Sequence, residues 1–326
     1  MARLREIISE LQGNLLAAAA VLKIDLVTSS LEKLEILDQR TSSLASDSAV
    51  IRASAEHNVQ QASEILQCQQ EQKYQKACKW LSAPSPFIDY NRAIREHHPG
   101  TGLWFLDCNE QFASWKTSFK SAYWIHGKPG CGKTVLSAVI IRHLKESVVA
   151  IENTTLAYFF FNFNDKAKTK VDKLVRSLVL QLAVQTPNGQ SELVNLYTSH
   201  SDLEELDYAT LLAFLRRLIS STSVYLVIDA LDECEEGREI TDLIQAILGW
   251  NLDLLRVIFT SRNEEHLRAA LEPLVSWEID LENEYLNADL RNYIRETVTS
   301  DEELGAWSDH VQEEIVEALI EGANGM

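Results

Sequence analysis

The sequence predicts an α/β domain with a mostly parallel five-stranded sheet, preceded by a helical region and followed by the start of a helical subdomain. Short apolar runs rich in Val, Ile and aromatic residues alternate with helix-like patterns, as expected of buried strands covered on both faces. The chain has 326 residues, 46% of them hydrophobic, which allows about two domains. The predicted strands span residues 122–126, 156–161, 224–229, 256–261 and 276–279.

The N-terminal region has a helical pattern. Neither Gly nor Pro occurs from Asn14 to Ala83, and apolar side chains recur every three or four residues as far as Leu37. From Thr41 to Gln75, Ser and Gln dominate, so this stretch is a solvent-exposed helix, a partner-dependent coiled coil or a partly disordered segment. No strict apolar heptad persists over four repeats, which disfavours the coiled coil.

Charge and cysteine content narrow the classes of function. The net charge is −18, and residues 201–326 hold 29 acidic and 8 basic side chains, which argues against non-specific nucleic-acid binding. Five cysteines without CxxC spacing argue against a disulfide framework or a zinc site. The run LLAAAAVL is far shorter than the ~20 residues of a bilayer span. We expect a cytosolic protein without a transmembrane segment.

One glycine-rich stretch carries a specific chemistry. GKPGCGKT at residues 127–134 fits the P-loop pattern G-x-x-x-x-G-K-[ST] and lies between a predicted strand and a predicted helix. Glycines let the backbone wrap a phosphate, Lys133 would reach the β- and γ-phosphates, and the Thr134 hydroxyl would bind Mg²⁺. A chance Gly-rich turn is the alternative. The predicted nucleotide-binding residues are Gly127, Lys128, Pro129, Gly130, Cys131, Gly132, Lys133, Thr134 and Val135.

An acidic strand end would complete the site. VYLVIDALDEC places Asp229 at the tip of an apolar strand, where it would hold Mg²⁺ together with Thr134. Asp232 or Glu233 would activate a water, although either could simply be a charge at a helix N-terminus. The candidate strand 156–161 lies between the P-loop and this strand in sequence, which suits the additional-strand class of P-loop enzymes.

The next predicted strand ends in IFTSR. It places Arg262 at the sheet edge where ligands bind, so Arg262 would contact the γ-phosphate or, alternatively, pair with the acidic half of the chain. The predicted catalytic residues are Lys133, Asp232, Glu233 and Arg262.

With these motifs, the chain resembles the NACHT family of signal-transduction NTPases (the STAND class), especially fungal NLR-like proteins of the heterokaryon-incompatibility type. The resemblance covers roughly residues 80–326. It rests on GTGLWFLDCNEQFASW (100–115), YWIHGKPGCGKTVLSAVIIRHL (123–144), LVIDALDEC (226–234), VIFTSRNEEHL (257–267) and the tail from ADLRNYI to LIEGANGM (288–326).

The resemblance implies a switch that binds ATP or GTP with Mg²⁺, hydrolyses it slowly, forms homo-oligomers on activation and controls an N-terminal effector with helical partners. It divides the chain into a helical effector end or linker (1–80), a linker leading to the nucleotide site (81–121), the NTPase domain (122–281) and an incomplete helical subdomain (282–326). Relatives continue into further helical subdomains and repeats, so we expect a fragment.

Two other classes of function remain open. An AAA-like or other P-loop ATPase would act mechanically or metabolically, and a scaffold would carry a vestigial P-loop. A small-molecule kinase would need an Arg-rich lid that the sequence does not show, and a Ras-type GTPase is disfavoured because no N-K-x-D motif occurs. The intact Lys133, Thr134, Asp229 and Glu233 argue against the scaffold.

Overall fold

The computed structural model describes residues 2–147, 151–200, 206–282 and 284–323. The chain divides into two units, Met1–Gln72 and Lys73–Met326. The helices are α1 (Ala2–Leu81), α2 (Phe87–Glu96), α3 (Glu110–Thr117), α4 (Lys133–Ser147), α5 (Val171–Gln185), α6 (Gly189–Ser199), α7 (Tyr208–Ser220), α8 (Gly237–Gly249), α9 (Glu265–Leu271), α10 (Glu284–Ser300) and α11 (Asp309–Ala323). The strands are β1 (Ser121–His126), β2 (Thr154–Phe160), β3 (Ser223–Asp229), β4 (Leu255–Ser261) and β5 (Trp277–Asp280).

The five strands form one parallel sheet in the order β2-β3-β4-β1-β5. The fold class predicted from the sequence is therefore confirmed, and each predicted strand lies within a residue or two of an observed one. The argument for the additional-strand class needs a correction. The strand that separates the P-loop strand β1 from the acidic strand β3 is β4, which follows both in sequence, whereas the 156–161 strand is β2 at the sheet edge.

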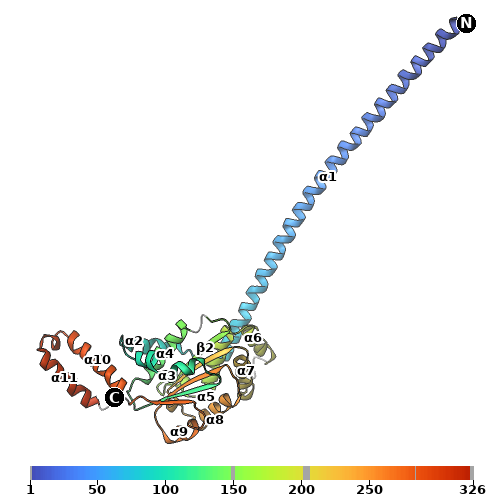
Figure 1. Cartoon of the computed structure of the whole chain (residues 1–326). Coiled ribbons are helices and arrows are strands. Elements are labelled where there is room, and N and C mark those ends of the chain that lie inside the picture. Colours follow the sequence, from blue (N-terminus) through green and yellow to red (C-terminus); the bar gives the residue numbers. More distant parts are fainter. Residues whose placement is uncertain (1, 148–150, 201–205, 283, 324–326) are drawn as a thin grey trace. The chain divides into compact units, whose positions relative to one another are not determined.

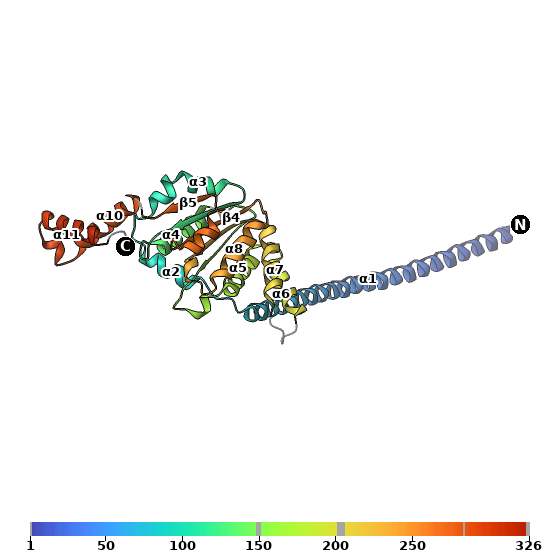
Figure 2. The ribbon, with the colours of Figure 1, turned by 90° about the horizontal axis from the view of Figure 1, so that it is seen from below.

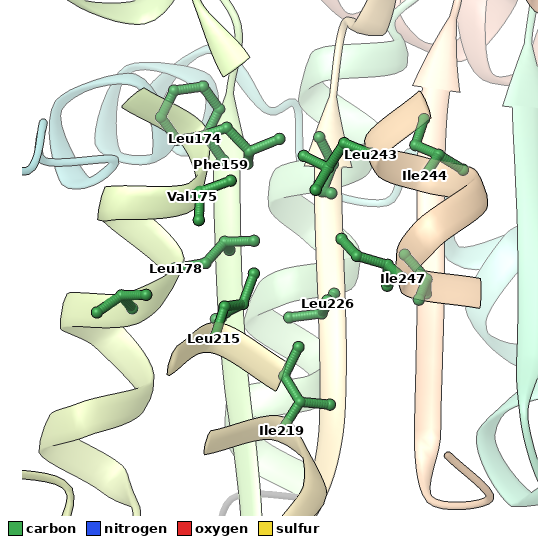
Figure 3. Close-up of a cluster of buried hydrophobic side chains, with 14 of the residues drawn as sticks. Phe159, Leu174, Val175, Leu178, Leu215, Ile219, Leu226, Leu243, Ile244 and Ile247 are labelled. Atoms are coloured by element: carbon green, nitrogen blue, oxygen red, sulfur yellow. The ribbon is translucent and has the colours of Figure 1, made fainter. Parts of the chain in front are cut away.

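Both faces of the sheet are covered by helices (Figures 1 and 2). On one face, α5, α7 and α8 pack against side chains such as Phe159 and Leu226, as Figure 3 shows. On the other face, α3 and α4 pack against alternate strand residues such as Tyr158 and Val227. Because side chains alternate between the faces of a strand, a sheet buried on both faces needs continuous apolar runs. That requirement explains why the strands were visible in the sequence.

The segment before β1 is more ordered than the linker expected for residues 81–121. It contains α2, a π-helical turn at Trp104–Cys108 and α3. Phe105, Phe112 and Trp115 from this segment are fully buried in the core beside α4. The expected domain functions stay predictions, but residues 73–121 fold as part of the second unit.

The first unit consists of the long helix α1. Helix is continuous from Ala2 to Leu81, so the partly disordered alternative for residues 41–75 is not observed. The final turns belong to the second unit, where Ala77 and Leu81 enter the core. An 18-residue window of α1 has mean hydropathy 1.4 and is long and apolar enough to cross a membrane by length and composition alone. This weakens the expectation that no segment could span a bilayer.

After β5 the chain forms two helices, α10 and α11, which contact each other. They share a small apolar cluster of Ile294, Val298 and Val316. Arg291 binds Glu317, and Arg295 binds Glu313 at 2.8 Å. A pair of helices therefore occupies the region where the start of a helical subdomain was expected. Residues 324–326 of the expected tail lie outside the described residues.

Candidate nucleotide-binding site

The P-loop connects β1 to α4, and its glycines are required by its geometry. Gly130 and Gly132 have φ angles of 81° and 84°, the left-handed region that glycine adopts without strain. A Cβ atom on Gly127 would lie 2.8 Å from the Cys131 sulfur. The loop therefore depends on glycine at three positions, two for backbone angle and one for space.

The lysine of the loop caps the loop's own carbonyl groups. Lys133 Nζ donates to the backbone oxygens of Gly127 at 2.8 Å and Lys128 at 2.7 Å. α4 begins at Lys133, so the first N–H groups of this helix have no acceptor in the preceding turn. The ammonium group and the helix N-terminus together form a positive end suited to a phosphate.

Three hydroxyl groups converge on the carboxylate of Asp229. Thr134 donates to Oδ2 at 2.8 Å, Ser137 donates to Oδ1 at 2.7 Å and Thr260 donates to Oδ1 at 2.5 Å. Asp229 is fully buried, and burial raises the pKa of its carboxyl although the three hydroxyl bonds act in the opposite direction. Sequence reasoning missed Ser137 and Thr260. The spacing of Ser137 from Thr134, three residues along a helix, is the signal that could have revealed the first of them.

The two acidic residues after β3 have different environments. A left-handed residue, Ala230 (φ 58°), ends the strand, and a short 3₁₀ turn follows at Leu231–Glu233. Asp232 binds Arg262 through Nε at 3.1 Å and through the backbone N–H at 2.9 Å. Glu233 instead accepts a bond from the backbone N–H of Phe163 at 3.1 Å, and burial raises its pKa. Asp232 is thus engaged with the next strand end, which leaves Glu233 as the carboxylate beside the Asp229 cluster.

A cavity of about 360 Å³, here called the phosphate cavity, lies at this end of the sheet. Thr134, Asp229 and Glu233 line it together. α2 contributes Arg92, and the loop after β2 contributes Asn162; neither was among the predicted residues. Lys133, Asp232 and Arg262 are not part of this lining, so the structure brings together only some of the predicted catalytic set.

A second cavity of about 260 Å³, here called the base cavity, is lined in part by the P-loop. Gly130, Cys131, Gly132 and Val135 line it from the loop, and residues of 96–104 and α10 line it from outside. Asp289 connects α10 to the 96–104 segment, because it accepts hydrogen bonds from the Gly102 N–H at 2.6 Å and from the Trp104 indole N–H at 3.1 Å. Its mixed apolar and polar lining suits a planar heterocycle.

The residues present fit a magnesium nucleotide. No cluster of three or more His, Cys, Asp or Glu side chains able to hold a metal occurs among the described residues. Mg²⁺ does not need one, because it is usually bound through one or two carboxylates together with substrate phosphates and water. A hydroxyl and a carboxylate oxygen 2.8 Å apart, at Thr134 and Asp229, supply the hard oxygen ligands that it prefers. 

The remaining predicted residues lie around the loop. Lys128 points to Glu282, with an ion pair of 2.7 Å, rather than into the phosphate cavity. Cys131 is buried, and its pKa is raised by burial. Pro129 lies in the turn between Lys128 and Gly130. The individual roles assigned to all these residues from the sequence stay predictions.

Comparisons with known proteins agree with this site. The profile of the family described as nephrocystin 3, N-terminal matches residues 100–262, half of the chain. The vegetative incompatibility protein HET-E-1 of Podospora anserina is 29% identical over 211 residues, which cover 59% of this chain and 15% of that protein. The chain therefore spans a small part of this relative's length.

Solved structures were also compared. The Orc1 protein of Aeropyrum pernix in complex with DNA gives a TM-score of 0.37 at 16% identity over 54% of this chain and 43% of that one. The replication initiator DnaA, bound to AMPPCP and single-stranded DNA, gives 0.33 at 11% identity over 65% of this chain and 57% of that one. Scores this low add nothing to the argument from the site itself.

The extent of the family match decides the assignment. It runs from the segment before the P-loop, through the loop and the acidic strand end, to Arg262, which follows β4. The likeness to HET-E-1 agrees with the resemblance to fungal NACHT proteins of the heterokaryon-incompatibility type. The chain is a nucleotide-binding P-loop NTPase, and it belongs to the nephrocystin 3 N-terminal family.

Proposed function

We propose that the protein is a cytosolic signalling switch that binds ATP or GTP with Mg²⁺, hydrolyses it slowly and thereby controls oligomerisation and an N-terminal effector. The observation that carries this proposal is the buried Asp229 carboxylate, held by the Thr134, Ser137 and Thr260 hydroxyls at the mouth of the P-loop. Burying a charge in this way is costly unless a cation repays the cost on binding. A vestigial site would have no reason to keep it.

The residues of the chain have distinct tasks in such a site. Lys133 leaves its resting bonds to the Gly127 and Lys128 carbonyls when a phosphate offers a stronger, charged acceptor. The magnesium ion, when bound, neutralises charge that develops on the phosphates. Glu233 accepts a proton from water, and its raised pKa makes it a better base than an exposed glutamate. The Phe163 N–H holds the carboxylate in place.

Slow turnover is supported by the position of Arg262. A positive side chain at the γ-phosphate is worth orders of magnitude in the rate of phosphoryl transfer. In the structure the Arg262 guanidinium is paired with Asp232, a side chain that is only 4% exposed, and it does not line the phosphate cavity. Arg262, which follows β4, would therefore not supply its full charge to catalysis.

The role as a switch is supported by the relative HET-E-1, whose name describes vegetative incompatibility. The 211 aligned residues of HET-E-1 are a small share of that protein, so the extension of its role to this chain is part of the proposal. The five cysteines are all free thiols, which suits a reducing cytosol.

The first test measures binding of fluorescent ATP and GTP analogues with and without Mg²⁺. Lys133→Ala should abolish binding, whereas Lys173→Ala, which removes a partly exposed lysine outside the P-loop, should not. Glu233→Gln should keep binding but slow phosphate release about 100-fold or more. Competition between unlabelled ATP and GTP identifies the base. Absence of Mg²⁺-dependent binding at millimolar nucleotide, in a folded wild-type protein, contradicts the switch and favours a scaffold.

A further inference from the structure

The helix α1 exposes an apolar stripe that nothing in its own unit covers. Every described side chain from Ala2 to Lys73 is exposed. Five large apolar residues between positions 34 and 65 lie along one stripe, and they are between 56% and 69% exposed. This stripe, here called the α1 seam, comprises Leu34, Leu37, Leu44, Ile51 and Ile65.

The seam follows the seven-residue repeat of a coiled coil. One heptad position holds, in order, Leu37, Leu44, Ile51, Asn58 and Ile65. The second core position holds Leu34, followed by the small residues Thr41, Ser48, Ala55 and Ala62. The sequence alone showed no strict apolar heptad because these small residues interrupt it. A continuous helix places both sets on one face over more than four heptads.

A helix of this kind needs a partner. Helices in water are marginal unless an amphipathic face is packed, and Ser, Thr and Asn are poor helix formers. A row of exposed Leu and Ile side chains along one face marks a surface that binds another protein or a membrane. The burial of this row, rather than helix propensity, must stabilise residues 34–65.

The charges beside the seam identify the partner. Lys33 and Asp47 flank the seam on one side, and Asp38 and Arg52 lie five residues after them on the other side. Charges five residues apart do not face each other on one helix. No ion pair joins these four side chains to anything in the described part of the chain. In a parallel two-stranded coiled coil, that spacing places each residue opposite its counterpart on the second helix.

We propose that residues 34–65 of α1 bind the same residues of a second copy in a parallel, in-register coiled coil. Lys33 then meets Asp38 of the second copy, and Asp47 meets its Arg52, twice each by symmetry. Asn58 faces its own counterpart, and a carboxamide both donates and accepts hydrogen bonds. Small residues at the second core position let the two backbones approach closely.

A membrane fits the seam less well. The helix does contain a window apolar enough to span a bilayer, and that window is the one around LLAAAAVL. It lies N-terminal to the seam. The seam itself includes Thr41, Ser48 and Asn58, which are unfavourable toward lipid and acceptable in a protein core that pairs them. Binding to lipid is therefore an outcome of the test rather than part of the proposal.

The oligomeric state tests the proposal first. Sedimentation equilibrium of the nucleotide-free full chain should give a dimer. Lys133→Ala should dimerise equally, so the result is independent of the proposed nucleotide switch. A monomer at tens of micromolar overturns the proposal. A monomer that co-sediments with phospholipid vesicles shows that the apolar face serves a membrane.

Disulfide trapping tests orientation and register. Leu37→Cys and Ile65→Cys each place a thiol in the seam, about 42 Å apart along the helix. Both should form disulfide-linked dimers on mild oxidation, in a background with the exposed Cys68 and Cys108 changed to Ser. The matched controls Gln39→Cys and Gln67→Cys, on the outer face, should not. In an antiparallel pair, at most one of the two seam positions faces the same residue of the second copy. Cross-linking of only one of the two variants therefore overturns the proposal.

A charge exchange tests the flanking pairs. Asp47→Lys brings like charges together at both symmetric contacts and should weaken dimerisation about fivefold at low salt. The double variant Asp47→Lys with Arg52→Asp restores opposite charges and should recover the wild-type dissociation constant. If the single and double variants weaken dimerisation equally, the predicted pairing is contradicted, because the Arg52 substitution then does not compensate for the Asp47 substitution.

Discussion

Asp229 illustrates how single residues in this site serve binding at the expense of folding. Its carboxylate is fully buried, and burial raises its pKa above the ordinary value. A group whose folded pKa is raised contributes stability only below its unfolded pKa, and that contribution is lost as the pH rises through the folded pKa. Above the pKa of the folded state, the ionised Asp229 therefore destabilises the ligand-free fold.

The substitution Asp229→Asn should accordingly stabilise the ligand-free protein by about 1–2 kcal/mol, since it removes a desolvated charge while its amide can still bond the three hydroxyls. Urea unfolding in the presence of EDTA measures this. The same variant should lose the stabilisation that Mg²⁺ and nucleotide give the wild type, which is about 2.7 kcal/mol at 100 times the dissociation constant. A ligand-free variant less stable than wild type would contradict the argument.

Glu233 makes a prediction about pH. Burial raises its pKa, and a water-activating carboxylate must be ionised. The rate of hydrolysis should therefore fall as the pH drops through this raised pKa, at a higher pH than for an exposed glutamate. Single-turnover rates between pH 4.5 and 8 (roughly the titration range of a shifted carboxyl) measure this.

The control for that profile is Asp232→Asn, which breaks the pair with Arg262. It should move the acid limb to lower pH, because the Asp232 charge helps to raise the pKa of Glu233, whereas Glu233→Gln should remove the limb. An acid limb that persists in Glu233→Gln assigns the titration to another group.

At the scale of elements, α2 is attached to the sheet by a buried ion pair. Asp89 on α2 binds Lys168 of the short 3₁₀ turn after β2, and each side chain is at least nine-tenths buried. Asp89 also contacts Arg92 at 3.0 Å, and Arg92 lines the phosphate cavity. This pair thus fixes the helix that forms one wall of the nucleotide site.

Breaking the pair from one side should cost more than replacing it. Asp89→Asn leaves the buried Lys168 with only its longer contact to Asp165, at 3.7 Å, and we expect a loss of about 3 kcal/mol in unfolding free energy. The double variant Asp89→Leu with Lys168→Met should be closer to wild type in urea unfolding. If both lose the same amount, the pair stabilises through packing and not through its charges.

The same elements show what a sequence can and cannot reveal. The five strands were predicted because a sheet buried on both faces leaves continuous apolar runs, as in VYLVID. The P-loop and Asp229 were predicted because their chemistry fixes residue type and spacing. The partners Thr260 and Ser137 were not, because any small residue fits their local sequence. The pairing of Asp232 with Arg262 joins residues 30 apart, and only the order of the strands, with β4 beside β3, brings them together.

At the scale of the whole molecule, the chain combines two units with different sources of stability. Residues 73–326 bury an extensive core on both faces of a sheet. The described residues of the first unit, 2–72, have no core of their own, and on the proposal above they gain stability only by pairing with a second copy. The two units should therefore respond differently to protein concentration.

All seven tryptophans lie in residues 73–326, so their fluorescence reports that unit alone, whereas helical circular dichroism also reports α1. On heating, the dichroism should show an α1 transition whose midpoint rises when the protein is made about twenty times more concentrated, because dimer formation follows mass action. The tryptophan transition should not move. The variant Leu44→Asp, with a charge in the seam, should lower the first midpoint and leave the second unchanged. A single transition seen identically by both probes at every concentration would mean that the two units unfold together and that α1 is stabilised within one copy.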